Sequence, residues 1–418
     1  MRIEHLNSHY DLIIIGGGLV GASFACAVER SPELGELSVL LVEAKPLATD
    51  AAATQPGNFD ARSTALSYGS AQIFQRLGLW DELDGEASAI REILVSDLGH
   101  FGTTRLSAEE QRVEALGYVV ENRVLGRALH RRLGEAERLA VAVPATVSGI
   151  QPVADGMRLT LHHAEADKVV DATLVVLADG GKSPICEQLG IEQIRRDYDQ
   201  HALITNIGFE QPHRNIAFER FTDTGPLAVL PLTDDGVSSQ PRGALVWALT
   251  AQQANDYMEL PDDVLLPILQ ARFGHQLGRI TRIGEKFRYP LALSYAREQI
   301  RPGLVLLGNV AHSLHPVAGQ GLNLALRDCE ALTDSLQQAR RAGKGLGEMA
   351  VLQSYLDRRT ADQERTIYFT DRLVRLFSST KLSYSLLRRF GMLALDLAPG
   401  IRRHFALQTM GIDGSGAR

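Results

Sequence analysis

The segment Asp11-Leu-Ile-Ile-Ile-Gly16-Gly-Gly18-Leu-Val-Gly21 joins a short apolar run to a glycine-rich turn. The apolar run predicts a parallel β-strand that is buried on both faces. The glycines allow a tight turn and a close approach of the backbone to a phosphate. The small and apolar residues 22–29 then predict a helix, whose first N–H groups would face that anion.

A second apolar strand, residues 38–42, ends at Glu43. Glu43 follows the last glycine at the spacing from which a carboxylate reaches a ribose hydroxyl in dinucleotide-binding folds. A glycine motif alone is a weak signal, but here strand, glycines, helix, second strand and acid occur in the right order. We therefore predict that Gly16, Gly18, Gly21 and Glu43 bind a dinucleotide, and these residues alone do not distinguish FAD from NAD.

Two later apolar strands end in glycine-containing turns. The strand 173–178 is followed by Asp179 and Gly180, and the strand 304–307 is followed by Gly308 and Asn309. An acidic turn after a strand is common, so the first segment carries little information by itself. The second is more specific, because a Pro/Gly loop and a helix follow it.

The segment 312–323 is this Pro/Gly loop with the start of its helix. Backbone N–H groups at a helix start stabilise negative charge, such as the charge of a reduced flavin. Glycine would let the chain lie against the flavin ring without a clashing Cβ. The loop therefore favours FAD. We expect His315, Pro316, Gly319 and Gln320 at the reacting edge of the flavin, and Gly319, Gly321, Leu322 and Asn323 in contact with the cofactor.

His312 and His315 are three residues apart, a spacing that also occurs in metal sites. A proline follows His315, so the pair is not expected on a regular helix, and no carboxylate stands nearby in the sequence as a third ligand. The three cysteines are far apart and form no CxxC pair, which favours buried thiols over a disulfide framework or a zinc site. We predict no metal.

Length and composition are those of a globular protein with room for two domains: 418 residues, 45% hydrophobic and 22% charged. The net charge of −7 argues against nucleic acid as a partner. The N-terminal residues do not resemble a signal peptide, and no apolar run is long enough to span a membrane. These features predict a cytoplasmic protein.

Taken in order, the motifs resemble those of the single-component FAD-dependent aromatic hydroxylases. The sequence of residues 309–328 is most similar to the ubiquinone-biosynthesis branch of that family, and the segments 59–67 and 393–399 also resemble that branch. The resemblance covers the whole chain. One departure is Asn309, where most members carry Asp. An amide still accepts a hydrogen bond, and the methoxyphenol hydroxylases of this branch resemble the chain in having Asn there.

The resemblance implies an α/β fold: a Rossmann-like FAD-binding domain of the aromatic-hydroxylase type, an inserted and mainly antiparallel substrate domain, and C-terminal helices. The implied boundaries are 1–70, 100–180 and 290–345 for the discontinuous FAD-binding domain, 71–99 and 185–285 for the substrate domain, and 350–418 for the helical region. Arg62 and Arg123 lie in segments that the family uses against FAD. Without the resemblance, the sequence around each arginine favours a solvated surface charge.

The implied activity is that of a monooxygenase with noncovalent FAD, NAD(P)H as a transient co-substrate and O2. The implied substrate is a polyprenylated phenol, such as 2-polyprenyl-6-methoxyphenol, and the implied partners are other proteins of ubiquinone biosynthesis. The alternatives are hydroxylation of another ring position or of a soluble phenol, a flavin oxidase or dehydrogenase, and a non-catalytic flavoprotein subunit of a quinone-synthesis assembly.

Beyond Gln353 the chain reads as helices in which basic residues alternate with leucines. The basic residues are Arg372, Arg375, Lys381, Arg388, Arg389, Arg402 and Arg403. A helical cap on the FAD-binding domain would have this pattern. So would a basic amphipathic surface that rests on anionic lipid, which would place the protein peripherally on the inner face of the cytoplasmic membrane.

Overall fold

The computed structural model describes residues 5–47, 62–98, 103–163, 166–234, 240–315, 319–378, 407 and 410–411. Four features singled out in the sequence lie outside these residues: the segment 59–61, Pro316, the segment 393–399, and the basic residues from Lys381 to Arg403. Side chains of residues 373–378 are likewise not described, so Arg375 carries no structural argument.

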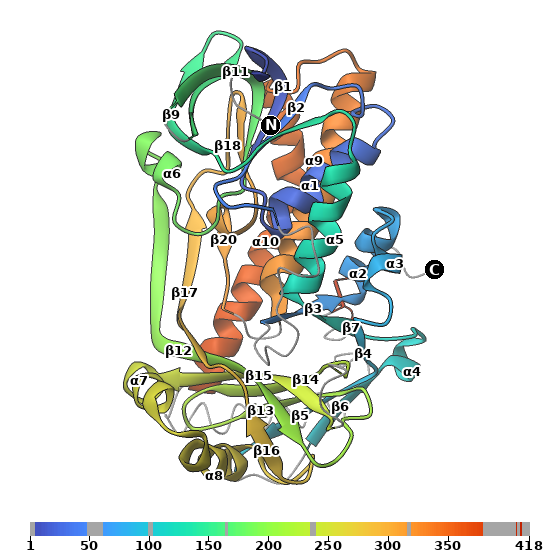
Figure 1. The fold of residues 1–418 in the computed structure, drawn as a ribbon, viewed down its shortest axis with the longest axis vertical. Helices are drawn as coiled ribbons and strands as arrows, with labels where there is room; N and C mark the ends of the chain where they lie inside the picture. The colour runs from blue at the N-terminus through green and yellow to red at the C-terminus, as the bar shows by residue number, and fades with distance from the viewer. Residues whose placement is uncertain are drawn as a thin grey trace.

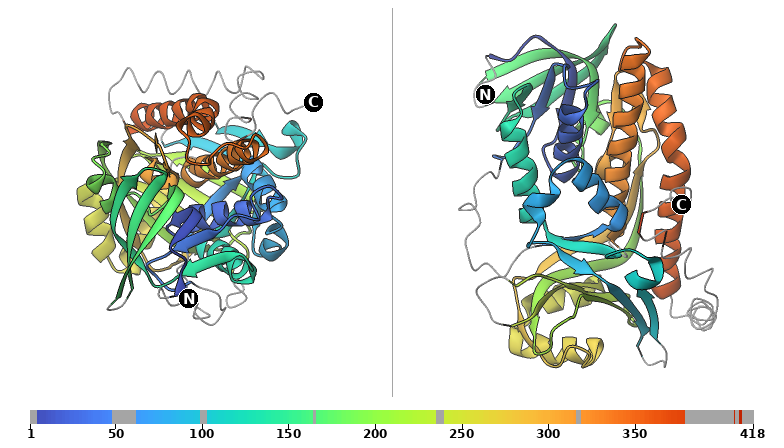
Figure 2. Two further views of the ribbon diagram at one scale, coloured as in Figure 1. Left: turned by 90° about the horizontal axis from the view of Figure 1, so that it is seen from above. Right: turned by 90° about the vertical axis from the view of Figure 1, so that its right-hand side faces the viewer.

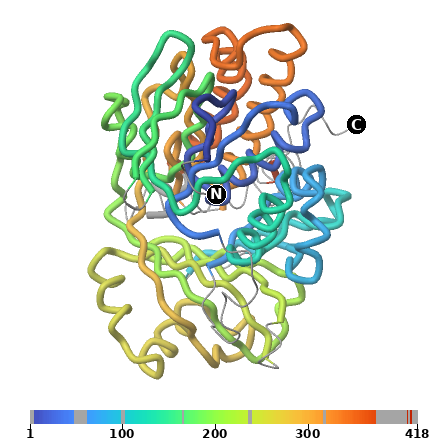
Figure 3. Tube along the Cα trace, turned by 45° about the horizontal axis from the view of Figure 1, so that its top comes forward, coloured from blue at the N-terminus to red at the C-terminus, as the bar shows by residue number. Residues whose placement is uncertain are grey.

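An eight-stranded sheet carries the glycine motif in the upper part of Figure 1. Its strands are β1 (His9–Ile15), β2 (Val39–Val42), β8 (Leu139–Ala142), β9 (Thr146–Val153), β10 (Gly156–His163), β11 (Ala166–Leu177), β18 (Ile300–Arg301) and β19 (Leu304–Leu306). Strand β1 pairs in parallel with β2 and β11, and β11 pairs in parallel with β19. In Figure 3, blue, green and orange segments accordingly lie side by side there.

The strand β1 is buried on both faces, as its apolar run predicts. Leu12 and Ile14 pack into one hydrophobic cluster together with α1 (Leu19–Arg30), α5 (Asn122–Glu135) and α9 (Gln320–Arg341). Ile13 and Ile15 pack into a second cluster on the other face. Alternate side chains of a strand point to opposite faces, so one continuous apolar run supplies both layers.

A nine-stranded sheet forms the lower part of Figure 1. Its strands are β5 (Glu92–Asp97), β6 (Thr103–Ser107), β12 (Gln193–Phe209), β13 (Ile216–Phe221), β14 (Pro226–Pro231), β15 (Arg242–Thr250), β16 (Ile280–Ile283), β17 (Phe287–Ala296) and β20 (His312–Ser313). The sequence alternates as in an antiparallel sheet over residues 201–209, 216–221, 227–232 and 244–250, which predicts four strands there. All four are present, with antiparallel pairing among β12, β15, β14 and β13. The pair β13 and β5 is parallel.

The two faces of this sheet have different neighbours. The outer face packs on α7 (Ala251–Glu259) and α8 (Asp262–Phe273), which contribute Leu265 and Leu269 to a cluster with Trp247. The inner face packs on a small sheet of β3 (Ser63–Ser67), β4 (Ser88–Ile90) and β7 (Gly117–Glu121), through a cluster that contains Ala217 and Ala244. The inner face is therefore the one turned toward the nucleotide motif.

The predicted segment 71–99 divides between the two parts. Helix α2 (Tyr68–Arg76) and the short α3 (Trp80–Leu83) pack with α1 and α5, because Phe74 and Leu83 belong to the same cluster as Phe24. Strand β5 instead pairs with β13 in the nine-stranded sheet, and β6 follows it there. The sequence of the segment did not predict this division, because the residues against which its helices and its strand pack lie elsewhere in the chain.

The remaining helices are α4 (Ala108–Gln111), α6 (Pro184–Gln188), the 3-10 helix η3 (Gly308–Val310) and α10 (Met349–Ser378). Helices α9 and α10 run side by side along one edge of the molecule (Figure 2, right). Strands β12 and β17 run between the two large sheets in Figure 1. Strand β20 belongs to the nine-stranded sheet through β17, and α9, which follows it in the chain, packs on α1 and α10.

Candidate functional site

The glycine turn after β1 has the geometry that its motif predicts. Gly16 has φ +103°, and a Cβ at this residue would lie 2.4 Å from the carbonyl oxygen of Ala178. A Cβ at Gly21 would lie 1.9 Å from the carbonyl oxygen of Gly16. At Gly18 a Cβ would meet no described atom within 4 Å. Two of these glycines therefore allow the strand and helix to pack closely, whereas Gly18 faces open space.

The N-terminus of α1 opens toward this space. Gly18 is its N-cap, and no side chain caps the first turn, so several backbone N–H groups there lack an intrahelical partner. Beside it, Glu43 Oε2 accepts a hydrogen bond from Gly17 N over 2.6 Å, and Oε1 accepts one from Lys45 N over 2.8 Å. Each carboxylate oxygen can accept more than one hydrogen bond, so Glu43 retains capacity for a hydroxyl donor.

Asp179 follows β11 and holds a carboxylate oxygen without a partner. Its Oδ2 accepts a hydrogen bond from the Ser183 hydroxyl over 2.7 Å, while Oδ1 is buried and has no hydrogen-bond partner among the described residues. Burial raises the pKa of Asp179, although the Ser183 hydroxyl opposes the shift. A buried acceptor without a donor costs free energy of the order of 1–3 kcal/mol. A ligand hydroxyl would relieve that cost.

The turn after β19 lies against α1. Gly308 has φ +71°, and a Cβ there would lie 3.0 Å from the side chain of Val20. The next residue, Asn309, is exposed in η3. A Cβ at Gly181 would lie 3.9 Å from the Cβ of Asn309. The structure therefore brings the Asp179-Gly180 turn and the Gly308-Asn309 turn together, as parallel strands β11 and β19 require.

The flavin loop, which we define as residues His312–Asn323, ends in the first turn of α9. Gly319 is the N-cap with φ +60°, and no side chain caps this helix. A Cβ at Gly321 would meet no described atom within 4 Å. Gln320 is buried, and Leu322 is half-buried against the helical cluster. Like the start of α1, this second helix start thus has no side-chain cap, and a glycine beside it leaves room near the backbone.

The side chain of Asn323 is held by protein partners. Its Oδ1 accepts a hydrogen bond from Ser67 N over 2.8 Å, and its Nδ2 donates to Ala65 O at 2.9 Å and to Gly319 O at 2.7 Å. These protein partners use both ends of the amide. Asn323 therefore joins the start of α9 to β3, and its contact with the cofactor stays a prediction.

His312 belongs to a buried ionic network. Its Nε2 lies 2.6 Å from Asp328 Oδ2, and Arg359 donates to Asp328 Oδ1. None of the side-chain surface of His312 or Asp328 is exposed. Burial alone would raise the pKa of Asp328, but the hydrogen bonds and charges of His312 and Arg359 outweigh it and hold that pKa below its usual range.

Asp328 is not close to His312 in the sequence, but it lies about two turns into α9, and the fold brings its carboxylate to this histidine. The network continues through Asp362, which contacts both Arg359 and Arg327. Across the described ranges, no group of three or more His, Cys, Asp or Glu side chains is arranged to hold a metal ion. The ion pairs of His312 tie the flavin loop to α9 and α10.

His315 is buried at the other end of the loop. Its ring meets Tyr198 of β12 edge to face, with 5.6 Å between the ring centroids. Tyr198 donates a hydrogen bond to Asp371 of α10 over 2.9 Å. Burial lowers the pKa of His315 to about 4, so the imidazole is neutral at physiological pH. His315 is thus linked to α10 through Tyr198.

The two predicted arginines find protein partners. Arg62 donates to the Tyr289 hydroxyl over 2.6 Å, and its guanidinium lies 5.8 Å from the ring centroid of Phe287. Arg123 pairs with the buried Glu121, which also receives a hydrogen bond from Arg242 of β15 over 3.0 Å. The sequence gave no sign of the Glu121–Arg242 pair, which joins the small sheet to the inner face of the nine-stranded sheet.

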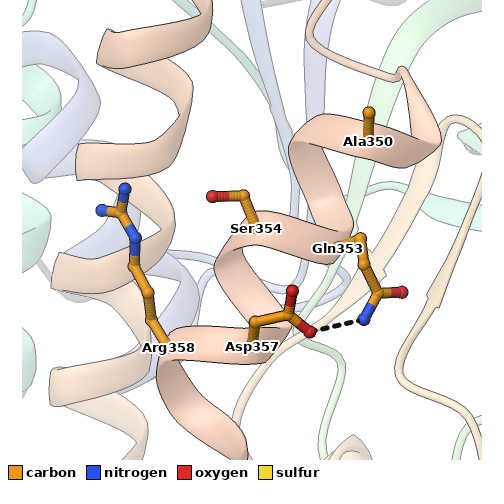
Figure 4. Close-up of a pocket in the computed structure, with 5 residues that line it drawn as sticks. All are labelled: Ala350, Gln353, Ser354, Asp357 and Arg358. Carbon is orange, nitrogen blue, oxygen red and sulfur yellow. Dashed lines mark hydrogen bonds between the residues drawn. The ribbon is translucent and has the colours of Figure 1, made fainter.

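A surface groove on α10 does not coincide with these motifs. Ala350, Gln353, Ser354, Asp357 and Arg358 line it (Figure 4), and its volume is about 510 Å³. The amide of Gln353 donates to Asp357 over 2.8 Å, one turn further along the helix. No residue of the nucleotide motifs or of the flavin loop takes part, so this groove is separate from the candidate site.

The observed geometry fits FAD. Two uncapped helix starts, at Gly18 and Gly319, provide backbone N–H donors for anionic groups. Open space at Gly18 and Gly321 leaves room for a ligand close to the backbone. The unpartnered oxygen of Asp179 and the carboxylate of Glu43 offer acceptors for hydroxyl groups. Pyrophosphate, ribityl and ribose hydroxyls, and the carbonyl edge of an isoalloxazine ring together require such a set.

Comparison with known proteins agrees with this geometry. The family model described as FAD binding domain matches residues 9–370. A ubiquinone hydroxylase, UbiL, of Rhodospirillum rubrum is 35% identical over 404 residues, which cover 96% of this chain and 89% of the relative. The 3-demethoxyubiquinol 3-hydroxylase of Escherichia coli is 29% identical, with 97% and 100% covered. The human mitochondrial ubiquinone biosynthesis monooxygenase COQ6 is 28% identical, with 93% and 89% covered.

Solved structures share the fold at lower identity. The p-nitrophenol 4-monooxygenase PnpA of Pseudomonas putida has a TM-score of 0.77 at 16% identity and covers 97% of this chain and 99% of its own. PqsL of Pseudomonas aeruginosa has a TM-score of 0.72 at 20% identity, with 89% and 97% covered. These similarities show a common architecture.

Proposed function

The chain belongs to the family of FAD-binding domain proteins, and from that membership we propose that it hydroxylates the ring of a polyprenylated phenol in ubiquinone biosynthesis. The proposed reaction consumes one NAD(P)H and one O2 per product and releases one water. Three relatives in the comparison above are named as hydroxylases or monooxygenases of ubiquinone metabolism, and each aligns over most of its length. A substrate such as 2-polyprenyl-6-methoxyphenol would fit this group.

One structural observation supports the proposal most directly. The start of α9 is connected through Ala65 to the inner side of the nine-stranded sheet: a Cβ at Gly319 would lie 3.2 Å from the Cβ of Ala65, and Ala65 packs with Ala217 and Ala244 of that sheet. A planar phenol on this side of the sheet would therefore lie near a flavin ring bound at the start of α9.

FAD supplies the redox chemistry: it takes hydride from NAD(P)H and delivers one oxygen atom of O2 to the ring. The residues of the chain position this chemistry. Glu43 and Asp179 would hold hydroxyl groups of the cofactor, and the uncapped N-terminus of α9 would stabilise negative charge on the reduced ring. Asn323 keeps that helix start in place through its three hydrogen bonds. NAD(P)H would bind transiently, since the sequence contains no second complete glycine motif after a strand.

The proposal also concerns how the substrate arrives. A long prenyl tail resists transfer into water by about 0.8 kcal/mol per methylene, so it stays in lipid or in an apolar groove while the ring reaches the flavin. Among the described residues, no helix has the length and apolarity needed to cross a bilayer. We place the contact with the membrane, or with a partner protein of ubiquinone biosynthesis, at the basic C-terminal region beyond Arg372.

Measured stoichiometry tests the function. The purified holoenzyme, given NAD(P)H, O2 and 2-geranylphenol, should form one hydroxylated product for each NAD(P)H and each O2 consumed. Release of peroxide with no hydroxylated product would instead identify an oxidase. Absence of NAD(P)H oxidation with every phenol, in a preparation that contains stoichiometric FAD, would leave a non-catalytic flavoprotein subunit.

A further inference from the structure

One row of side chains crosses the inner face of the nine-stranded sheet without being fully covered. Pairing in the sheet aligns its members directly: Val95 of β5, Glu219 of β13, Ala228 of β14, Val246 of β15, Ile204 of β12 and Phe287 of β17. We call this set the open row. All six residues are half-buried. With strands about 4.8 Å apart, six strands span about 24 Å.

The open row lies on the side of the nucleotide motif. Ala217, two residues before Glu219 on the same face, packs in the cluster that contains Ala65. Phe287, at the opposite end, lies beside the guanidinium of Arg62. Neighbouring rows on the same face are mostly buried, among them Ala202, Ala244 and Ala248. The open row is thus a partly exposed strip on the inner face of the sheet, with more deeply buried rows beside it.

Glu219 is the one ionisable residue of the open row. Its row neighbours on either side are Val95 and Ala228, and its neighbours along β13 are Ala217 and Phe221. None of these side chains can donate a hydrogen bond. The protein surrounds the carboxyl so closely that burial raises the pKa of Glu219 to about 7, yet part of the residue remains accessible. A partly accessible carboxyl with no donor among these neighbours is suited to a ligand that supplies a hydrogen-bond donor.

We propose that Glu219 accepts a hydrogen bond from the phenolic hydroxyl of the substrate, with the apolar part of the molecule lying along Ala228, Val246 and Ile204. This inference rests on the proposed function and adds to it the residue that orients the ring. The ring hydroxyl would lie at Glu219, two residues from Ala217 and hence on the side of the start of α9. The tail of the substrate would run toward Phe287, at the other end of the open row.

The hydrogen bond has a chemical consequence. Electrophilic attack on the ring is faster when the phenolic oxygen carries more electron density. As the new carbon–oxygen bond forms and the O–O bond of the oxygen donor breaks, the phenolic O–H proton moves to a Glu219 carboxylate oxygen, and its electron pair makes the ring ketone. The ring C–H proton then passes to the oxygen that remains on the donor, which is finally released as water. Its electron pair restores aromaticity, and the proton held by Glu219 returns to the phenolate oxygen. Glu219 begins and ends the reaction as a carboxylate.

Ligand binding to the FAD-loaded enzyme tests the inference without turnover. We compare 2-geranylphenol with its O-methyl ether, which lacks only the hydroxyl donor, by the change in flavin absorbance at pH 8. A hydrogen bond to a charged acceptor should make the phenol bind about 10- to 100-fold more tightly than the ether. In Glu219→Leu this ratio should fall close to one, while the affinity for the ether stays within about threefold.

Two further variants separate the effects. Glu219→Gln keeps an acceptor of similar shape, so it should retain part of the preference for the phenol but lose most of the hydroxylation rate. Glu210→Gln removes a carboxyl that is exposed and paired with Arg279, and should match the unaltered enzyme. An unchanged phenol-to-ether ratio in Glu219→Leu, with normal FAD content, would overturn the role of Glu219. Failure of the unaltered holoenzyme to bind either ligand would instead contradict the proposed substrate class.

Discussion

The side chain of Asn323, at the start of α9, accepts a hydrogen bond from the backbone N–H of Ser67 over 2.8 Å, and so joins two segments that lie 256 residues apart in the chain. The same amide donates to Ala65 and to Gly319. Hydrogen bonds to β3 therefore hold the start of α9 in place, in addition to the backbone conformation that Gly319 allows.

Replacing Asn323 should loosen the flavin loop before it unfolds the protein. Asn323→Leu removes the acceptor for the Ser67 N–H and the donor to the Ala65 and Gly319 carbonyls, and leaving a buried N–H unsatisfied costs about 1–3 kcal/mol. We expect weaker FAD binding and a lower melting temperature, measured by cofactor titration and calorimetry. Asn323→Gln is the matched control for amide chemistry. A Leu variant with unaltered FAD affinity would show that the clamp does not support the cofactor site.

Removing the charge of Asp328 should destabilise the fold. Asp328→Asn leaves Arg359 and His312 buried beside a neutral amide, and breaking a buried ion pair from one side costs about 3–5 kcal/mol. His312→Gln, which keeps a donor to Asp328, should cost less. Denaturant unfolding of the apo-proteins measures both. Equal stabilities of Asp328→Asn and the unaltered chain would contradict a structural role of the network.

Alanine at three motif glycines should separate folding from cofactor binding. Gly21→Ala places a Cβ 1.9 Å from Gly16 O and should destabilise the apo-protein. At Gly18 and Gly321 a Cβ meets no described atom within 4 Å. Alanine there should leave the apo-protein as stable as before but weaken FAD binding by roughly tenfold, about 1.4 kcal/mol. Normal FAD affinity in both of these variants would move the cofactor away from the two helix starts.

Glu219 should make stability depend on pH. Its pKa in the folded protein is about 7, above the ordinary value of 4.5, so the folded state holds a proton that the unfolded state releases. Stability is therefore fully present below the ordinary value and falls as pH rises toward 7. Because Glu219→Gln never ionises, it should be more stable than the unaltered chain at pH 8, by on the order of 1–3 kcal/mol, and equally stable at pH 4. A constant difference between the two, measured by urea unfolding across this range, would show that burial does not perturb Glu219.

The C-terminal basic residues should govern lipid contact. We expect the intact chain to float with liposomes that contain anionic lipid, and to float less at high salt. Glutamate at Arg388, Arg389, Arg402 and Arg403 should abolish flotation. If both proteins float equally, or neither floats, the region is a structural cap or binds a partner protein.

The sequence by itself determined the FAD-binding half of the architecture. Residues 11–43 specify a strand, a glycine turn, a helix and an acid through local rules: β-branched residues favour a buried strand, and a turn with φ +103° at Gly16 requires glycine. The same holds for the strands between residues 201 and 250, whose alternation matches the pleat of a sheet. Such features can be predicted because their physical causes lie within a few residues.

Only the tertiary structure decided which side chains face one another across long stretches of chain. Asp328 reaches His312, and Arg242 reaches Glu121, because helix and sheet packing brings them together. For the same reason, helix α2 packs with α1 and α5, whereas strand β5 pairs with β13 in the nine-stranded sheet. Glu219 gives no local signal at all. In the sequence it is a charged residue on an amphipathic strand. Its partly buried position follows from the register of the sheet and from the nucleotide-binding part, which covers the inner face of the sheet. Burial depends on such neighbours, which the strand itself does not contain.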